Sequence, residues 1–302
     1  MNRFGNHHFF ILTFMTVFLL MLSGCGGGDS TTAPGAVGSA TISGTAVKGP
    51  IDSGTVRAYA VVNGASGTQL ATAVTDSLGN FSMTVQNYAG PVMLIMTGGT
   101  YTDEASGVVM TMAANDVMTA VVPTISNGSM ITGMQITPLT SMAQARAAHM
   151  INGMIAANID AANTAISNYF MVQDILYTVP INPLVTASGA GASQDMINYG
   201  ITIAAMTQYA QTIGMTHSSG IVTALMDDAS DGIMNGMMGK TSISMAGMGG
   251  MMGGTMMQST AGTTGLANAM TTFMNSSMNQ SGLSAGSVQP LITHLSTTSG
   301  TF

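Results

Sequence analysis

The first half of the chain alternates apolar and polar positions with a period of two. Between residues 40 and 136, short runs rich in Val, Thr, Ile and Met are separated by Gly, Asn and Asp. In the run 54–62, we expect Val56, Ala58, Ala60 and Val62 to share one face and to alternate with Thr55, Arg57, Tyr59 and Val61 on the other. Short strands with regularly spaced turns are typical of an antiparallel β-sandwich, which we predict for residues 40–136. The predicted strands are 40–47, 54–62, 69–75, 80–85, 92–97, 108–112, 117–122 and 130–136.

At Thr137 the spacing of apolar residues changes to three and four, as in a helix. Thr137 is a suitable N-cap, and Pro138 suits the first helical position. Ser193 can cap another helix, whose apolar residues form an a/d seam that ends before Gly214. We therefore predict that residues 137–302 form a helical bundle, which makes the chain a multidomain β and α protein. The predicted helices are 138–154, 159–170 after a break at Asn158, 194–213, 221–229 and 266–278, with a loop at 177–191.

An apolar stretch at the N-terminus, residues 9–22, follows Arg3 and leads to Leu-Ser-Gly-Cys at Cys25. The stretch is too short to span about 30 Å of hydrocarbon as a permanent anchor. The four residues look like a bacterial lipobox, so residues 1–24 are interpreted as a lipoprotein signal peptide. The resemblance implies cleavage before Cys25, acylation of that residue and export. The alternative is a lone buried cysteine after a chance apolar run.

The residues after Cys25 suggest a destination. Gly26, rather than Asp, follows the cysteine, and in enteric bacteria this pattern goes with sorting to the outer membrane. Residues 25–39 comprise the acylated cysteine and a Gly-, Ser- and Thr-rich segment, which we predict to be a flexible tether. We therefore expect a lipid anchor in the outer membrane, on either its periplasmic or its surface face.

One turn motif, Thr-Asp-Ser-Leu-Gly-Asn-Phe at residues 75–81, makes the sandwich more specific. Asp76 can accept backbone N–H groups of the turn, Gly79 can adopt a positive φ, and Phe81 can point into the core. Together with residues 44–50 and 56–59, the motif resembles the carboxypeptidase-regulatory-like domain. The resemblance implies a small transthyretin-like β-sandwich that serves as an accessory module and is not a catalyst. Residues 98–104 and 137–140 look like segments of uncharacterised bacterial lipoproteins with the same order of modules.

Composition excludes some functions. Charged residues make up 6% of the 302 residues, and the formal net charge is −7. A nucleic-acid surface needs several Lys or Arg side chains to neutralise phosphates, and only five are present, so no nucleic-acid partner is expected. A single cysteine excludes a framework of intramolecular disulfides.

The chain has 31 Met and 38 Gly, and both are concentrated in a Met/Gly-rich loop at about residues 234–262. Thioethers are soft ligands that suit Cu(I), and glycine lets repeated Met-x-x-Met fold around one ion. Met also packs irregular cores in place of Leu, which is the alternative for most of these residues. A sacrificial oxidation role is a further alternative for the loop. The candidate Cu(I) ligands are Met245, Met248, Met251, Met252, Met256 and Met257.

Other candidate sites are weaker. The acidic segment 227–236 fails as an EF-hand, because Ala229 and Met238 replace two of the ligands, and we interpret it as a solvated helix end with an Asp-Gly turn. Asp103 and Glu104 are interpreted in the same way, because adjacent carboxylates on a strand point apart. His149, His217 and His294 are far apart in sequence, and no Gly-x-Ser-x-Gly or Walker motif is present.

The sequence therefore predicts an outer-membrane lipoprotein with a non-catalytic binding or structural role at the cell envelope, without a cofactor. Its expected partners are the membrane, through the lipid anchor, and an envelope protein or polysaccharide. One alternative is a Cu(I)-handling protein that uses the Met-rich loop. Another is a divergent hydrolase whose catalytic residues are brought together only by folding.

Overall fold

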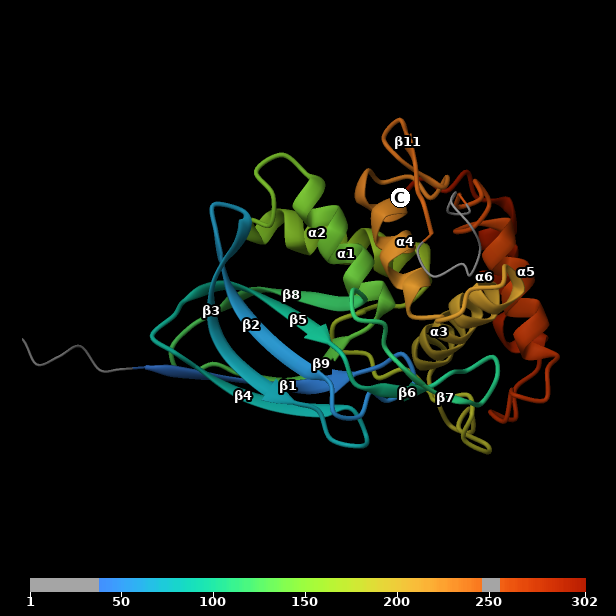
Figure 1. Ribbon diagram of the computed structural model, residues 1–302, viewed down its shortest axis with the longest axis horizontal. Helices are drawn as coiled ribbons and strands as arrows, with labels where there is room; N and C mark the ends of the chain where they lie inside the picture. The colour runs from blue at the N-terminus through green and yellow to red at the C-terminus, as the bar shows by residue number, and fades with distance from the viewer. Residues whose placement is uncertain (1–37, 246–255) are drawn as a thin grey trace, which may run out of the picture. The chain divides into compact units, whose positions relative to one another are not determined.

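The computed structural model describes residues 38–245 and 256–302 (Figure 1). Residues 38–302 cluster as one unit by their contacts. The predicted signal peptide, Cys25 and residues 25–37 lie outside the described residues. So do three of the candidate copper ligands, Met248, Met251 and Met252.

The strands form two larger sheets, and the protein has a mixed β and α fold. One sheet has the order β4-β1-β9, in which β1 and β9 are parallel and β1 and β4 antiparallel. The other has the order β3-β2-β5-β8 and is antiparallel throughout. The strands are β1 (Ser39–Ala46), β2 (Thr55–Val62), β3 (Ala65–Val74), β4 (Asn80–Gln86), β5 (Gly90–Thr97), β8 (Val117–Ile125) and β9 (Met130–Ile136).

Both sheets contribute to one core. Alternate residues of β1 and β2 are buried, as the period of two predicts. Ile42 from the first sheet and Val56 and Leu94 from the second belong to the same cluster of buried residues, which continues into the helices. The alternation in β2 ends at Val61, which is buried while Val62 is exposed, because the register with β3 shifts near this point.

A short hairpin, β6 (Thr100–Thr102) and β7 (Val109–Thr111), leaves the second sheet between β5 and β8. In Figure 1 it extends toward helix α3 (Gln194–Thr212). The sequence predicted a strand at 108–112 but not its partner β6. This hairpin carries part of the site described below.

The predicted N-caps at Thr137 and Ser193 are confirmed. The Thr137 side chain accepts the backbone N–H of Thr140 at the start of α1 (Pro138–His149), and Thr140 returns the bond in a capping box. Ser193 caps α3 in the same manner. The other helices are α2 (Ala156–Tyr169), α4 (Gly220–Ser230), α5 (Thr264–Met274), the 3-10 helix η1 (Ala285–Val288) and α6 (Gln289–Thr297); β10 (Met237–Met238) and β11 (Thr241–Ser242) form a short hairpin.

The predicted helix 138–154 is wrong in its last turn. It ends at His149, because Asn152 and Gly153 take positive φ angles of 70° and 61°. The predicted break at Asn158 is also wrong: Asn158 lies inside α2, and its side chain donates to the carbonyls of Ile151 and Gly153. At the C-terminal end α5 stops at Met274 rather than 278, and α6 was not predicted.

The helices pack on the strands as well as on one another. Helix α1 contacts β8, α2 and α4, and α3 contacts α5. A second, smaller cluster joins Val61, Met93 and Val121 of the sheet to Ala147 of α1 and Ile159 of α2. The predicted boundary at residue 137 coincides with the junction of β9 and α1. Within 38–245 and 256–302, no helix has the length and apolarity needed to cross a membrane.

Candidate functional site

A cluster of polar side chains is buried where the β6–β7 hairpin meets α3 and the start of α4. Each member exposes 7% of its surface or less. Buried polar groups are costly unless they find partners, so their pairing needs to be accounted for. We call the cluster the Lys48 network; it consists of Lys48, Tyr101, Asp103, Glu104, Asp116, Thr207, Ser218 and Ser219.

Lys48 enters the cluster from a tight turn. The turn follows β1 and is closed by a bridge between Val47 and Pro50. Gly49 has a φ of +59°, and a Cβ atom there would lie 2.6 Å from the carbonyl oxygen of Thr102. The glycine therefore lets the turn lie directly against β6, which aims the neighbouring lysine at the hairpin.

The Lys48 ammonium group is surrounded by acceptors. Nζ donates to Thr207 Oγ1 at 2.9 Å and to Ser218 Oγ at 2.8 Å. It also lies 3.6 Å from Glu104 Oε2 and 4.5 Å from the centre of the Tyr101 ring. An ammonium group has three protons and no acceptor site, so these neighbours satisfy it.

Asp103 and Glu104 are not the solvated strand residues that the sequence predicted. They lie in the turn after β6 and expose 3% and 2% of their surface. Asp103 Oδ1 accepts the backbone N–H and the hydroxyl of Ser106, which fixes the turn, and its Oδ2 accepts the hydroxyl of Ser218. Glu104 Oε2 accepts the hydroxyl of Thr207 at 2.7 Å. Both carboxylates therefore point inward, Asp103 to Ser218 and Glu104 to Thr207.

The two serines before α4 complete the network. Ser218 Oγ donates to Asp103 at 2.5 Å, accepts from Lys48, and lies 3.1 Å from the Tyr101 hydroxyl. Ser219 donates its backbone N–H to Tyr101 at 3.2 Å and its hydroxyl to Asp116 at 2.5 Å. The two serines at the start of α4 thus hold the β6–β7 hairpin and the residue before β8, both from the other half of the chain.

The charges in the network are few but concentrated. Glu104 is the one glutamate in the sequence, and Lys48 is one of two lysines. Their ion pair is the only one among the described residues. The network contains three carboxylates and one ammonium group, of which Glu104 alone pairs directly with Lys48, and charges interact more strongly in a protein interior than in water.

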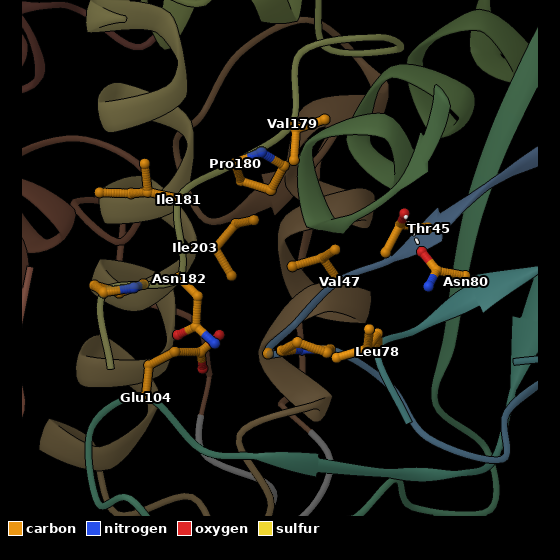
Figure 2. Close-up of a pocket in the computed structure, with 14 residues that line it drawn as sticks. Thr45, Val47, Leu78, Asn80, Glu104, Val179, Pro180, Ile181, Asn182 and Ile203 are labelled. Carbon is orange, nitrogen blue, oxygen red and sulfur yellow. Dashed lines mark hydrogen bonds between the residues drawn. The ribbon is translucent and has the colours of Figure 1, made fainter. Parts of the chain in front are cut away.

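A pocket of about 230 Å³ adjoins the network at Glu104. Figure 2 shows Glu104 and Asn182 along one side of the pocket, and Thr45, Leu78 and Asn80 along the other. Thr45 Oγ1 donates to Asn80 Oδ1 at 3.2 Å. The remaining walls are Val47, Gly49, Pro50, Val179, Pro180, Ile181, Pro183, Gly200 and Ile203.

The turn beside this pocket has the geometry that its motif predicted. Asp76 Oδ1 accepts the backbone N–H groups of Leu78 and Asn80 at 2.9 and 2.8 Å, Gly79 has a φ of +81°, and Phe81 is buried. The Asn80 side-chain bond to Asp76 is the main reason that the pKa of this exposed carboxyl is lowered. The rigid turn presents Leu78 at the mouth of the pocket.

The acidic segment 227–236 begins in the last turn of α4 and has the predicted Asp-Gly turn at Asp231 and Gly232, but Asp228 is buried and not solvated as the sequence predicted. Asp228 is fully buried, and its Oδ1 accepts the backbone N–H groups of Asn235 and Gly236. Its Oδ2 has no partner among the described residues. Burial raises the pKa of Asp228 to about 6, against the lowering effect of these backbone bonds.

The described candidate copper ligands do not share one environment. Met245 and Met257 are buried in the main core cluster, whereas Met256 is exposed. Met248, Met251 and Met252 lie outside the described residues. Among the described residues no group of three or more His, Cys, Asp or Glu side chains is placed to hold a metal ion. Copper binding by thioethers stays a prediction.

Comparison of the chain with protein-family models, with curated proteins and with solved structures gave no match in any of the three. The resemblances found in the sequence motifs therefore stay predictions. The function has to be argued from the residues themselves.

Proposed function

We propose that this protein is a lipid-anchored lipoprotein of the outer membrane whose folded part is a non-catalytic binding module at the cell envelope. The proposed location is supported by the lipobox-like residues before Cys25, the only cysteine in the sequence. Its partner is an envelope protein or a polysaccharide. The tether of residues 25–39 would give the folded part room to reach it.

We also propose that residues 40–136 form a transthyretin-like sandwich. The two sheets and their common core support it, because buried residues from β1, β2 and β5 belong to one cluster. The turn at Asp76 has the hydrogen bonds that the motif requires.

The observation that supports the non-catalytic role is that the side chains of the Lys48 network are buried and bonded to one another. A hydrolase built from Ser218 and Lys48 would need the amine to accept the serine proton. Ser218 instead donates that proton to Asp103, while Lys48 donates to Ser218 and lies beside Glu104. Ser218 is also 95% buried, since it exposes 5% of its surface. These residues join two parts of the fold and leave no nucleophile facing a substrate.

The anchor is tested by the fate of the full-length protein in a Gram-negative host. We expect the wild type to partition into detergent and the outer-membrane fraction, with a mass at the N-terminal peptide that corresponds to acylated Cys25. Cys25→Ser should abolish both. A wild-type protein that is unmodified at Cys25 would contradict the proposal.

The non-catalytic role is tested with a fluorophosphonate probe, which labels activated serines. We expect the wild type to be labelled no more than Ser218→Ala. Labelling of Ser218 in the wild type alone would favour the hydrolase instead.

A second candidate, Cu(I) binding by the Met-rich loop, has one supporting observation. Ser244 and Met256 form an antiparallel bridge, and the Met257 N–H donates to the Ile243 carbonyl at 2.8 Å. The two ends of the tract are therefore held together. Cu(I) should copurify with the protein and be lost when Met248, Met251 and Met252 are replaced by Leu; equal copper in both proteins would exclude this site.

A further inference from the structure

The pocket beside Glu104 has the form of a small-molecule site. It lies between the turn that carries Lys48, the turn at Asp76 and the segment 179–183 (Figure 2). Its volume, about 230 Å³, suits a short chain of a few carbon atoms. None of these three segments is a regular helix or strand, so their side chains converge on the space between them.

Most residues that line the pocket are apolar, and the uncharged polar ones are Thr45, Asn80 and Asn182. Val47, Ile181 and Ile203 line it, and three prolines contribute surface without a backbone N–H donor. At the mouth, Leu78 and Val179 expose 66% and 51% of their surface. An aliphatic chain would remove this apolar surface from water.

One charged group, Glu104, lines the pocket, and it is only partly satisfied. Both contacts that the described residues make to its carboxylate, from Thr207 and Lys48, go to Oε2. A carboxylate has about four acceptor positions, so Oε1 can still accept hydrogen bonds. Glu104 exposes only 2% of its surface, but among the described residues its Oε1 is not one of the buried atoms without a partner, so a ligand in the pocket can reach it.

The surrounding charge selects the sign of the ligand. Asp103 and Asp116 lie in the same network as Glu104, and Lys48 is its single cation. A ligand cation would complement this excess of carboxylates, whereas an anion would be repelled.

We propose that this pocket binds a short primary alkylamine, with its ammonium group on Glu104 and its chain along Val47, Ile181 and Ile203. The inference rests on the proposed function in one respect: the site binds its ligand and does not transform it. An ammonium group offers this acceptor three donors and a positive charge, whereas an alcohol of the same length offers one neutral donor and a carboxylate offers none.

The test is a calorimetric titration of the full-length protein in detergent with n-pentylamine, 1-pentanol and pentanoate at pH 7. We expect the amine to bind at least about tenfold more tightly than the other two, because the charge-assisted bond exists for the amine alone. Equal affinity for amine and pentanoate, or no binding of the amine at about 10 mM, would overturn the proposal. A lysine with blocked backbone amino and carboxyl groups, titrated in parallel, shows whether the site also takes the ammonium group of a peptide side chain or only that of a free amine.

Rim variants keep the test independent of folding. Val179 is exposed, so Val179→Lys should leave the fold intact while placing a cation at the mouth. We expect it to weaken pentylamine by about five- to tenfold, whereas the matched Val179→Gln stays within about twofold. Glu104→Gln should abolish the preference for the amine over the alcohol. Identical affinities for the Lys and Gln variants would contradict the charge argument. Neither result depends on the lipid at Cys25 or on probe labelling of Ser218.

Discussion

Replacing Lys48 by methionine should destabilise the protein far more than the small change in side-chain size suggests. Methionine retains most of the apolar length of lysine but removes the ammonium group. Glu104, with 2% of its surface exposed, then loses its only cation, and Thr207 and Ser218 each lose a donor. Removing one partner of a buried ion pair costs about 3–5 kcal/mol, so we expect a loss in this range.

The size of the loss can be measured by urea unfolding. The chain has no tryptophan, so circular dichroism is the suitable signal. A protein of typical stability, about 5–15 kcal/mol, should still fold with this substitution and show a lower midpoint at an unchanged slope. Lys240→Met is the matched control, because Lys240 is the other lysine and is exposed. We expect the control to change stability by less than about 0.5 kcal/mol.

A double-mutant cycle separates the pair from general effects of the substitution. Glu104→Gln keeps an acceptor for Thr207 and removes the charge that Lys48 faces. The double variant should be less destabilised than the sum of the single variants, with a coupling energy of about 1–3 kcal/mol. A Lys48→Met cost below about 1 kcal/mol, together with additive single effects, would refute the view that this pair is buried and coupled.

Three further outcomes follow from other residues. Burial raises the pKa of Asp228 from 3.8 to about 6, so the unfolded state binds fewer protons than the folded state between these pH values, and the free energy of unfolding should fall by up to about 3 kcal/mol as pH rises from about 4 to 6. Urea unfolding at pH 4.5 and 7 should show a smaller fall for Asp228→Asn than for the wild type. An equal fall in both proteins would contradict this. Gly49→Ala should lower the free energy of unfolding by about 2–3 kcal/mol. Gly98→Ala, which has a similar positive φ but no atom within 4 Å of its new Cβ, should lower it by about 1 kcal/mol. Equal losses of stability in urea unfolding would show that the contact with β6 is unimportant. Asn80→Ala should raise the pKa of Asp76, measured by NMR titration, because it removes the main hydrogen bond to that carboxylate; an unchanged pKa would contradict this assignment.

Regular elements were predictable where one periodicity persisted. The strands of both sheets and the starts of α1 and α3 follow from alternation and from caps at Thr137 and Ser193. The end of α1 was missed, because the apolar spacing continues through Met150 and Met154 while Asn152 and Gly153 turn the chain. Met154 lies beyond the end of the helix but is still buried, so the apolar spacing continues although the turn has ended the helix.

The Lys48 network could not be predicted in the same way, because its contacts are distant in sequence. Lys48 and Ser218 are separated by 170 residues, and Glu104 and Thr207 by 103. A signal was nevertheless available. The one glutamate and one of two lysines lie within segments that the sequence motifs had singled out, Lys48 in 44–50 and Glu104 in 98–104.

In a chain with so few charges, the buried Lys48 network determines how the hairpin and the helices pack together. Ala, Ile and Met are the commonest residues of the main core, and Met in particular adapts to several packings. A buried set of hydrogen bonds is satisfied in one arrangement, because each misplaced donor or acceptor carries its full desolvation cost. The network joins the β6–β7 hairpin to α3 and α4 through Glu104, Thr207 and Ser218. It therefore fixes how these elements dock, and with them the position of Glu104 in the pocket. A variant that weakens the network should accordingly lose amine binding before it loses its fold.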